Sequence, residues 1–102
     1  MKTFKAKTID GFADFEQVGS FVWYPNGSGV GFRMVILRDH FGHLNVTHRV
    51  STFKIADITP TIIGICAYDI KRAALLTLDK LVERVGVDRV RSKLSEAEKD
   101  AA

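Results

Sequence analysis

Apolar residues follow two different periods along the chain. The first two thirds contain short runs rich in β-branched and aromatic residues, which are typical of strands, and we place strands at 2–8, 20–24, 30–38 and 43–52. Turn-like sequences separate these runs, at Asp10-Gly11, at Asn26-Gly27 and at 39–42. The last three runs are therefore predicted to form an antiparallel meander.

Both faces of this predicted sheet are apolar. A hairpin turn at Asn26-Gly27 would place Trp23 opposite Val30 and Phe21 opposite Phe32. One face then carries Phe21, Trp23, Val30, Phe32, Met34 and Ile36, and the other carries Val22, Tyr24, Val35, Leu37, Leu44, Val46 and Val50. A sheet with one solvated face would alternate apolar and polar residues, so this sheet needs two covers.

Two alternatives account for the second cover. A large bare apolar face on a small domain tends to mark an interaction site, which indicates self-association or a protein partner. Alternatively, Phe4, Phe12, Phe15 and a second helix close that face within one chain.

The segment 59–67 fits two structures. Thr59 as N-cap with Pro60 at the first helical position would begin a helix. Three β-branched isoleucines interrupted by Gly64 are instead typical of a buried strand, which is the interpretation we favour.

The last third of the chain predicts helices. One helix is expected from 68 or 69 to 85, with Asp69 as N-cap and Gly86 at its end. Its apolar stripe consists of Ile70, Ala74, Leu78, Leu81, Val82 and Val85. A short second helix begins near 88, with Val87, Val90 and Leu94 on its inner side, and the polar tail 95–102 is expected to fray. The predicted fold class is α+β: an antiparallel meander of four to five strands packed against a C-terminal amphipathic helix plus a short second helix.

The composition is that of one globular domain over residues 1–102, with 46% hydrophobic and 26% charged residues. No apolar stretch approaches the roughly 20 residues of a membrane span, and the first residues lack the apolar core of a signal peptide. Cys66 is the only cysteine and lies in an apolar run, where it is expected to be buried. We therefore expect a soluble cytoplasmic protein without a disulfide.

Asp39, His40, His43 and His48 are the best candidates for metal chemistry, because imidazole and carboxylate groups bind zinc. On a strand, however, His43 and His48 would fall on opposite faces, and a structural zinc site needs four convergent ligands. We therefore predict no metal site. Asp39 and His40 are expected in a solvated turn, and His48 at the edge of the core.

No catalytic constellation is evident. The glycines between 27 and 31 join two strands and lack a following lysine, so they indicate a hairpin and not a phosphate loop. Cys66 has no histidine nearby in sequence, and no serine lies in a nucleophile elbow. We expect neither catalytic residues nor a cofactor.

Aromatic and basic residues share the predicted sheet, as they do on surfaces that stack on single-stranded nucleic acid. The net charge of +3 is not concentrated in one block and does not decide the matter. The candidates for contacting a protein partner or a nucleic acid are Tyr24, Arg33, Arg38, Phe41, Arg49 and Lys54.

These observations favour a small non-enzymatic protein that binds another macromolecule. A homodimer that acts as an adaptor or inhibitor, of the kind that mobile genetic elements encode, fits the two-faced sheet. The second hypothesis is a nucleic-acid-binding protein that uses the aromatic and basic residues of the sheet. The third is a small-ligand or metal site around the 39–48 hairpin.

Overall fold

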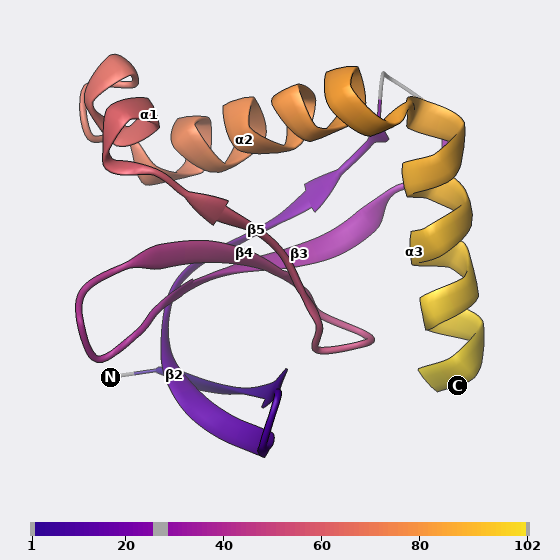
Figure 1. Ribbon diagram of the computed structural model, residues 1–102, viewed down its shortest axis with the longest axis horizontal. Helices are drawn as coiled ribbons and strands as arrows, with labels where there is room; N and C mark the ends of the chain where they lie inside the picture. The colour runs from indigo at the N-terminus through magenta and orange to yellow at the C-terminus, as the bar shows by residue number, and fades with distance from the viewer. Residues whose placement is uncertain (1, 26–28, 102) are drawn as a thin grey trace.

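Five strands form one antiparallel sheet in the computed structural model, which describes residues 2–25 and 29–101 (Figure 1). The strands are β1 (Thr3–Thr8), β2 (Gly11–Trp23), β3 (Phe32–Arg38), β4 (Leu44–His48) and β5 (Lys54–Ile58). Each strand pairs with the next in chain order. The predicted α+β class and its antiparallel meander are therefore confirmed.

The register between β2 and β3 differs from the prediction by two residues. Trp23 pairs with Phe32 and Phe21 with Met34. Just before β3, Gly31 lies close to the ring of Tyr24, where a Cβ would lie 2.7 Å from a ring carbon. The predicted Asn26-Gly27 turn lies outside the described residues. A shift of two residues preserves the side-chain faces, so the aromatic residues of both strands still point to one face.

The predicted face of β4 is wrong. Arg38 pairs with Leu44, and Ile36 pairs with Val46. Directly opposed residues of an antiparallel pair share a face, so Leu44 and Val46 join the core face of Ile36. Asn45 and Thr47 take the opposite face, which makes that face less apolar than expected.

The segment after β5 is helical, which corrects the favoured strand interpretation. Helix α1 (Pro60–Ile65) begins at the N-cap Thr59, whose hydroxyl accepts the N–H of Ile62 at 3.2 Å. This cap and the proline in the first turn outweigh the strand preference of the isoleucines. The strand of this region lies earlier, at β5.

Helix α2 (Ile70–Val85) begins and ends where the sequence predicts. Asp69 accepts the N–H of Arg72 at 3.1 Å, and Gly86, with φ of 99°, ends the helix. Buried residues of its inner face pack against the sheet together with Cys66, which is buried as expected. In Figure 1, α2 spans the top of the molecule and α3 turns down beside the sheet.

Helix α3 (Val87–Ala101) is longer than predicted, and the segment 95–101 is helical instead of frayed. Val90 and Leu94 are buried on its inner side, as expected. Glu98 extends this attachment, because its Oε2 lies 3.3 Å from Nε2 of His48. This contact lies within residues 95–101, the polar segment that the sequence predicts to fray.

His48 has the only ring of the three histidines that is buried, with no exposed surface on its side chain. Its Nδ1 lies 2.8 Å from Oγ of Ser51, and its ring meets Phe32 edge-on at 6.2 Å. Together with the Glu98 contact, both ring nitrogens have partners. His48 therefore joins the end of β4 to α3, in agreement with its predicted place at the edge of the core.

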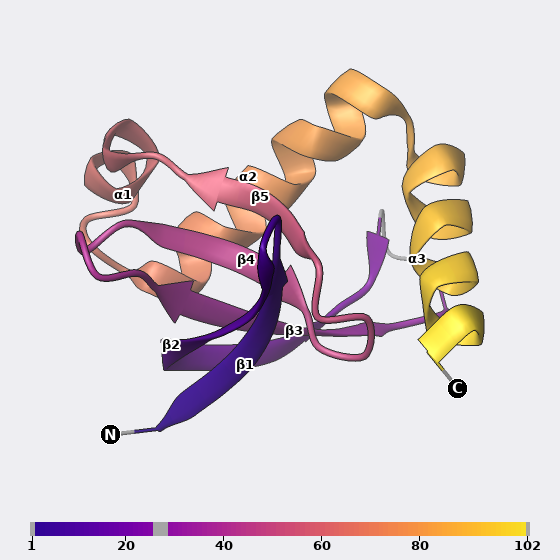
Figure 2. The same ribbon diagram turned by 60° about the horizontal axis from the view of Figure 1, so that its bottom comes forward.

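The second apolar face is covered within the chain by the N-terminal hairpin. The pairing of β2 with β3 is irregular between Gln17 and Gly19, and such irregularities bend a strand. The bend folds β1 and the first half of β2 over β3 (Figure 2). Phe4 and Phe15 then pack against a second cluster of buried residues, formed by Ala6, Val35 and Leu37. Phe4 and Phe15 therefore cover this face within the chain, as the second alternative predicts, although Phe12 stays exposed and the second helix packs on the other face.

We predict that Glu98→Ala lowers the free energy of unfolding by about 1–2 kcal/mol, because it leaves a buried ring nitrogen of His48 without its partner. Urea denaturation at pH 7 measures the change. Glu96→Ala is the matched control on the same helix, where the side chain is exposed, and it should change stability by less than about 0.5 kcal/mol. Equal effects of the two substitutions would contradict the role of this contact.

Candidate functional site

A groove opens where the curled sheet fails to close into a barrel. β1 and β5 are the two edges of the sheet. The N–H of Lys7 donates to the carbonyl of Thr52 at 3.0 Å, which fastens β1 to the turn between β4 and β5. Among the described residues, no other backbone hydrogen bond joins these two segments. The groove lies beside this contact, and its lining includes Lys7 and residues of both edge strands.

The groove has a volume of about 560 Å³ and an apolar floor made by Ala6, Phe15 and Leu37. It is larger than the hollows on either side of α3, which measure about 390 and 360 Å³. Its walls are more polar and include Lys7, Thr8, Asp39, Asn45, Thr47, Lys54 and Asp57. Concave sites of this size, with an apolar interior and a few polar groups, are typical of ligand and side-chain pockets.

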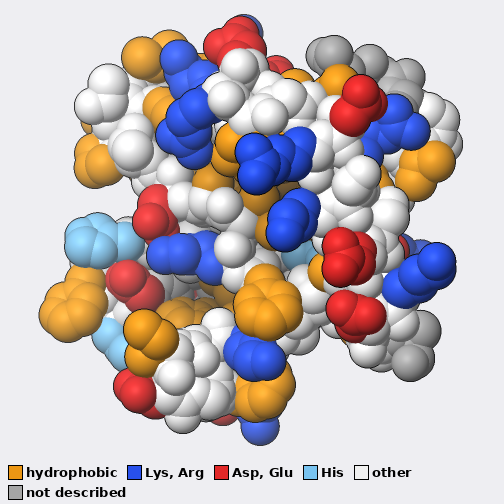
Figure 3. Space-filling model, turned by 45° about the vertical axis from the view of Figure 1, so that its right-hand side comes forward, with side chains coloured by type: hydrophobic (Ala, Val, Ile, Leu, Met, Phe, Trp, Pro, Cys, Tyr) orange, Lys and Arg blue, Asp and Glu red, His pale blue; other side chains and the backbone are white. Residues whose placement is uncertain are grey.

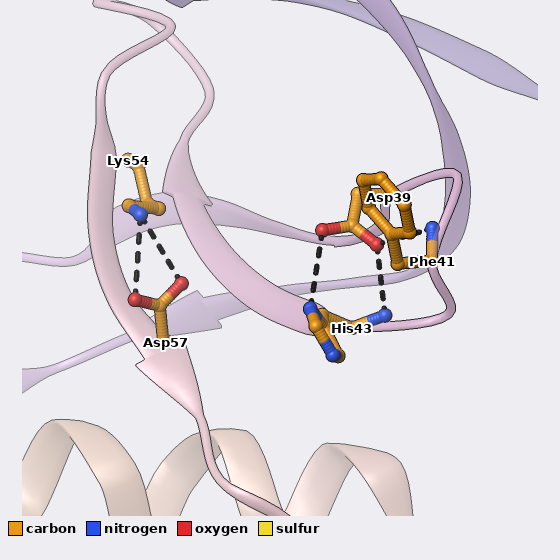
Figure 4. Close-up of polar contacts among 5 residues, drawn as sticks. All are labelled: Asp39, Phe41, His43, Lys54 and Asp57. Atoms are coloured by element: carbon orange, nitrogen blue, oxygen red, sulfur yellow. Dashed lines mark hydrogen bonds and ion pairs between the residues drawn. The ribbon is translucent and has the colours of Figure 1, made fainter.

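Two polar pairs lie along one wall of the groove. Lys54 Nζ lies 3.2 Å and 3.3 Å from the two carboxylate oxygens of Asp57 (Figure 4). Deeper in the groove, the hydroxyl of Thr47 donates to the side-chain oxygen of Asn45 at 2.8 Å. The charge of Asp57 is therefore balanced by its neighbour on β5.

Asp39 organises the turn at the mouth of the groove. Its Oδ1 accepts the backbone N–H groups of Phe41 and His43, both at 2.9 Å, as Figure 4 shows. Oδ2 lies 3.6 Å from Nδ1 of His43. The hydrogen bond from the His43 backbone, followed by that from Phe41 and the nearby imidazoles, lowers the pKa of the Asp39 carboxyl below 3.8. Asp39 is therefore a turn-forming carboxylate, as expected.

Large apolar side chains stand exposed at the rim of the groove. Ile9, at the tip of the β1–β2 turn, is 99% exposed, and Phe53 is 49% exposed. Lys7 Nζ lies 4.8 Å from the centre of the Phe53 ring, within range of a cation–π interaction. Phe41, which follows Asp39 in the turn, is 86% exposed. Ile9 and Phe53 line the groove and form its exposed apolar rim, whereas Phe41 is not part of the lining. Exposed apolar side chains grouped around a groove are typical of interaction surfaces.

The structure divides the six predicted contact residues into two groups. Lys54 lines the groove, Phe41 lies in the turn two residues after the groove residue Asp39, and Arg38 at the end of β3 forms an ion pair with Glu16 at 3.5 Å. The other group lies at the opposite end of β3, where Arg33 and Arg49 line a separate hollow of about 230 Å³ and Tyr24 packs over Gly31. No single surface therefore holds all six.

The histidines do not converge on a metal site. His40 and His43 are exposed in the β3–β4 turn, whereas His48 is buried at the far end of β4. Within residues 2–25 and 29–101, no group of three or more His, Cys, Asp or Glu side chains is arranged to hold a metal ion.

Sequence reasoning missed Lys7, Ile9, Asn45 and Phe53 as groove residues. Two signals were present: Ile9 is an apolar residue directly before the Asp10-Gly11 turn, and Phe53 interrupts a polar stretch. Asn45 gave no such signal, because its face depended on a register that the sequence did not reveal.

Comparison with known proteins adds no identity: no family model, no curated protein and no solved structure matches this chain. Across the described part of the chain, none of the helices combines the length and apolarity required to cross a membrane.

We predict that Asp39→Asn lowers stability at neutral pH and that this difference shrinks in acid. A carboxyl whose folded pKa is lowered contributes stability above its unfolded pKa, near 3.8, and loses it as pH falls through the folded pKa. Urea denaturation of both proteins at pH 7, 5 and 3 measures the difference. A constant or growing difference between pH 5 and pH 3 would contradict this account of Asp39.

Proposed function

We propose that this chain is a non-enzymatic binding protein that engages another protein through the groove and its apolar rim. The observation that carries the proposal is Ile9, a bulky apolar side chain held fully in solvent beside a groove with an apolar floor. Burying such a side chain in a partner would contribute about 1.5–3 kcal/mol. An adaptor or inhibitor uses a surface of this kind.

The charged groups in the groove wall support binding better than catalysis. Asp57 is held by Lys54, and Asp39 is engaged by the turn that it forms. General acid–base chemistry needs a group that is free to exchange a proton with a substrate. These two carboxylates instead have structural partners.

Self-association is a separate question from partner binding. The apolar face that prompted the homodimer hypothesis is covered within one chain by Phe4 and Phe15. Two copies of the chain could associate through the apolar rim of the groove, which is the surface that we assign to a partner. A second copy is therefore one possible occupant of that surface.

We predict that Ile9→Asp abolishes peptide binding at the groove without lowering stability, because the side chain makes almost no contact within the chain. The probe is a phage-displayed library of random 12-residue peptides, selected on the immobilised full chain. Ile65→Asp is the matched control, since Ile65 is also exposed but lies on α1, outside the groove.

Peptides that enrich on the native protein and on Ile65→Asp, but not on Ile9→Asp, would support the proposal. Equal enrichment on all three proteins would contradict it. Light scattering shows at the same time whether the chain exceeds its monomer mass of 11.4 kDa. A dimer that dissociates on Ile9→Asp would identify a second copy as the partner.

A specific observation also favours nucleic-acid binding as the second candidate. Arg33 and Arg49 are both exposed, and the N–H of Arg49 donates to the carbonyl of Arg33 at 2.9 Å. Among the described residues, neither guanidinium has a carboxylate within 4.0 Å. Two unpaired arginines beside the exposed Tyr24 resemble the phosphate-contacting and stacking groups of single-strand binders.

On this second proposal, Arg33→Ala and Arg49→Ala each weaken binding of a fluorescently labelled 20-nucleotide DNA strand by about three- to tenfold, and binding falls steeply with salt. Fluorescence anisotropy at 50 and 200 mM NaCl measures both effects. Arg72→Ala is the control, because that exposed arginine lies on α2. Binding that neither sheet substitution changes would exclude this surface.

A further inference from the structure

The polar groups of the groove are unevenly satisfied. Both of its carboxylates, Asp39 and Asp57, already have donors. Asn45 accepts through its side-chain oxygen from Thr47. Within the described part of the chain, however, neither the amide nitrogen of Asn45 nor Nζ of Lys7 donates to an acceptor. The groove therefore offers spare donors to whatever occupies it.

The lysines of β1 also indicate that the groove can bind an acceptor group. β1 and the residue before it carry three exposed lysines, at positions 2, 5 and 7, and no acidic residue. Across the described residues, none of the three has a carboxylate within 4.0 Å. Figure 3 shows one face of the molecule, on which Lys and Arg side chains are more numerous through the middle and Asp and Glu side chains lie mainly to either side. Within the described residues, the ammonium of Lys7 is therefore available to bind a carboxylate of an occupant.

The neighbourhood of the Lys7 ammonium is apolar on one side. It lies over the ring of Phe53, and the groove floor of Phe15 and Leu37 begins close by. An occupant that satisfies both features carries a carboxylate beside a bulky apolar group. A charge-assisted hydrogen bond at a partly desolvated rim is stronger than one between neutral groups.

We infer that the groove binds a protein segment in which an Asp or Glu side chain lies next to a bulky apolar residue, an inference that rests on the proposed function. The ammonium of Lys7 binds the carboxylate, and the apolar neighbour packs on Phe53 and the groove floor. A protein segment fits better than a free carboxylate, because the exposed side chains of Ile9 and Phe53 line the groove together with Lys7. A segment of several residues can cover both apolar side chains and the ammonium at once.

Addition of a strand to the sheet edge is a less suitable mode of binding. The outer edge of β5 carries the Lys54–Asp57 ion pair, and charged side chains are a common protection of edge strands against pairing. The occupant is therefore recognised through its side chains in the groove.

The experiment uses the peptides enriched by the native protein in the selection described above. We expect an acidic residue within two positions of Leu, Ile, Phe, Trp or Met in these peptides. Lys7→Glu should weaken their binding by at least about tenfold, the loss expected for one charge-assisted hydrogen bond. Lys80→Glu is the matched control on α2, where the side chain is exposed, and it should change affinity less than about twofold.

A second variant separates loss of charge from damage to the fold. Lys7→Ala removes the ammonium without adding a negative charge, and the backbone bond from residue 7 to Thr52 remains. We expect Lys7→Ala to weaken binding as well, by less than Lys7→Glu, with urea denaturation confirming that both variants fold. The free carboxylate 3-phenylpropionate, added as a competitor at 1 mM, should not displace the peptides.

The outcomes separate this inference from the proposed function. Enriched peptides that need Ile9 but lack acidic residues, or that bind Lys7→Glu as tightly as the native protein, would overturn the inference and leave the proposed function intact. Displacement by 3-phenylpropionate would make this a small-carboxylate site and overturn the assignment to a protein segment. Enrichment that does not depend on Ile9 would contradict both.

Discussion

The structure depends on a central strand that is buried on both faces. Met34 and Ile36 point to one side of β3, and Val35 and Leu37 point to the other, and each of the four is at most 1% exposed. A strand of this kind cannot lie at the surface of a two-layer domain, because each face must be removed from water. The helices cover the first face. Among the described residues, the buried cluster on the second face contains no helix residue, so the sheet covers that face itself.

Self-covering determines the shape of the sheet and produces the groove. The irregular pairing near Gly19 lets β2 bend, and the Cβ that glycine lacks would lie only 3.2 Å from Ile36. The bend carries Phe4 and Phe15 over Val35 and Leu37. The bent hairpin reaches the opposite edge of the sheet at one point, the bond from Lys7 to Thr52. The groove lies beside that bond and is lined by residues of both edge strands.

The sequence was informative wherever a local signal determined the structure. Asp69 and Gly86 bound α2 because a cap residue and a helix-ending glycine act within one turn. Pairing between segments was harder, since the face of Leu44 and Val46 depended on how the 39–43 turn sets the register. At Thr59, the local capping signal was present and correct, but the strand preference of the following isoleucines was given more weight. The groove could not be predicted, because it results from a bend and an incomplete closure that no single residue encodes.

The position of the exposed apolar residues connects this architecture to binding. Ile9 and Phe53 lie in or directly after two different turns, and the curl of the sheet brings both to the groove lining. Phe41 lies in a third turn, two residues after the groove residue Asp39. Apolar side chains on turns contribute little to the core of their own chain, which leaves them available to a partner. Lys7 combines a structural role with a surface role. Its backbone N–H bonds to Thr52 and closes the curl, while its side-chain ammonium lies over the ring of Phe53. The backbone bond survives any substitution of that side chain other than proline, so the surface chemistry of the groove can change while the closure that creates it is retained.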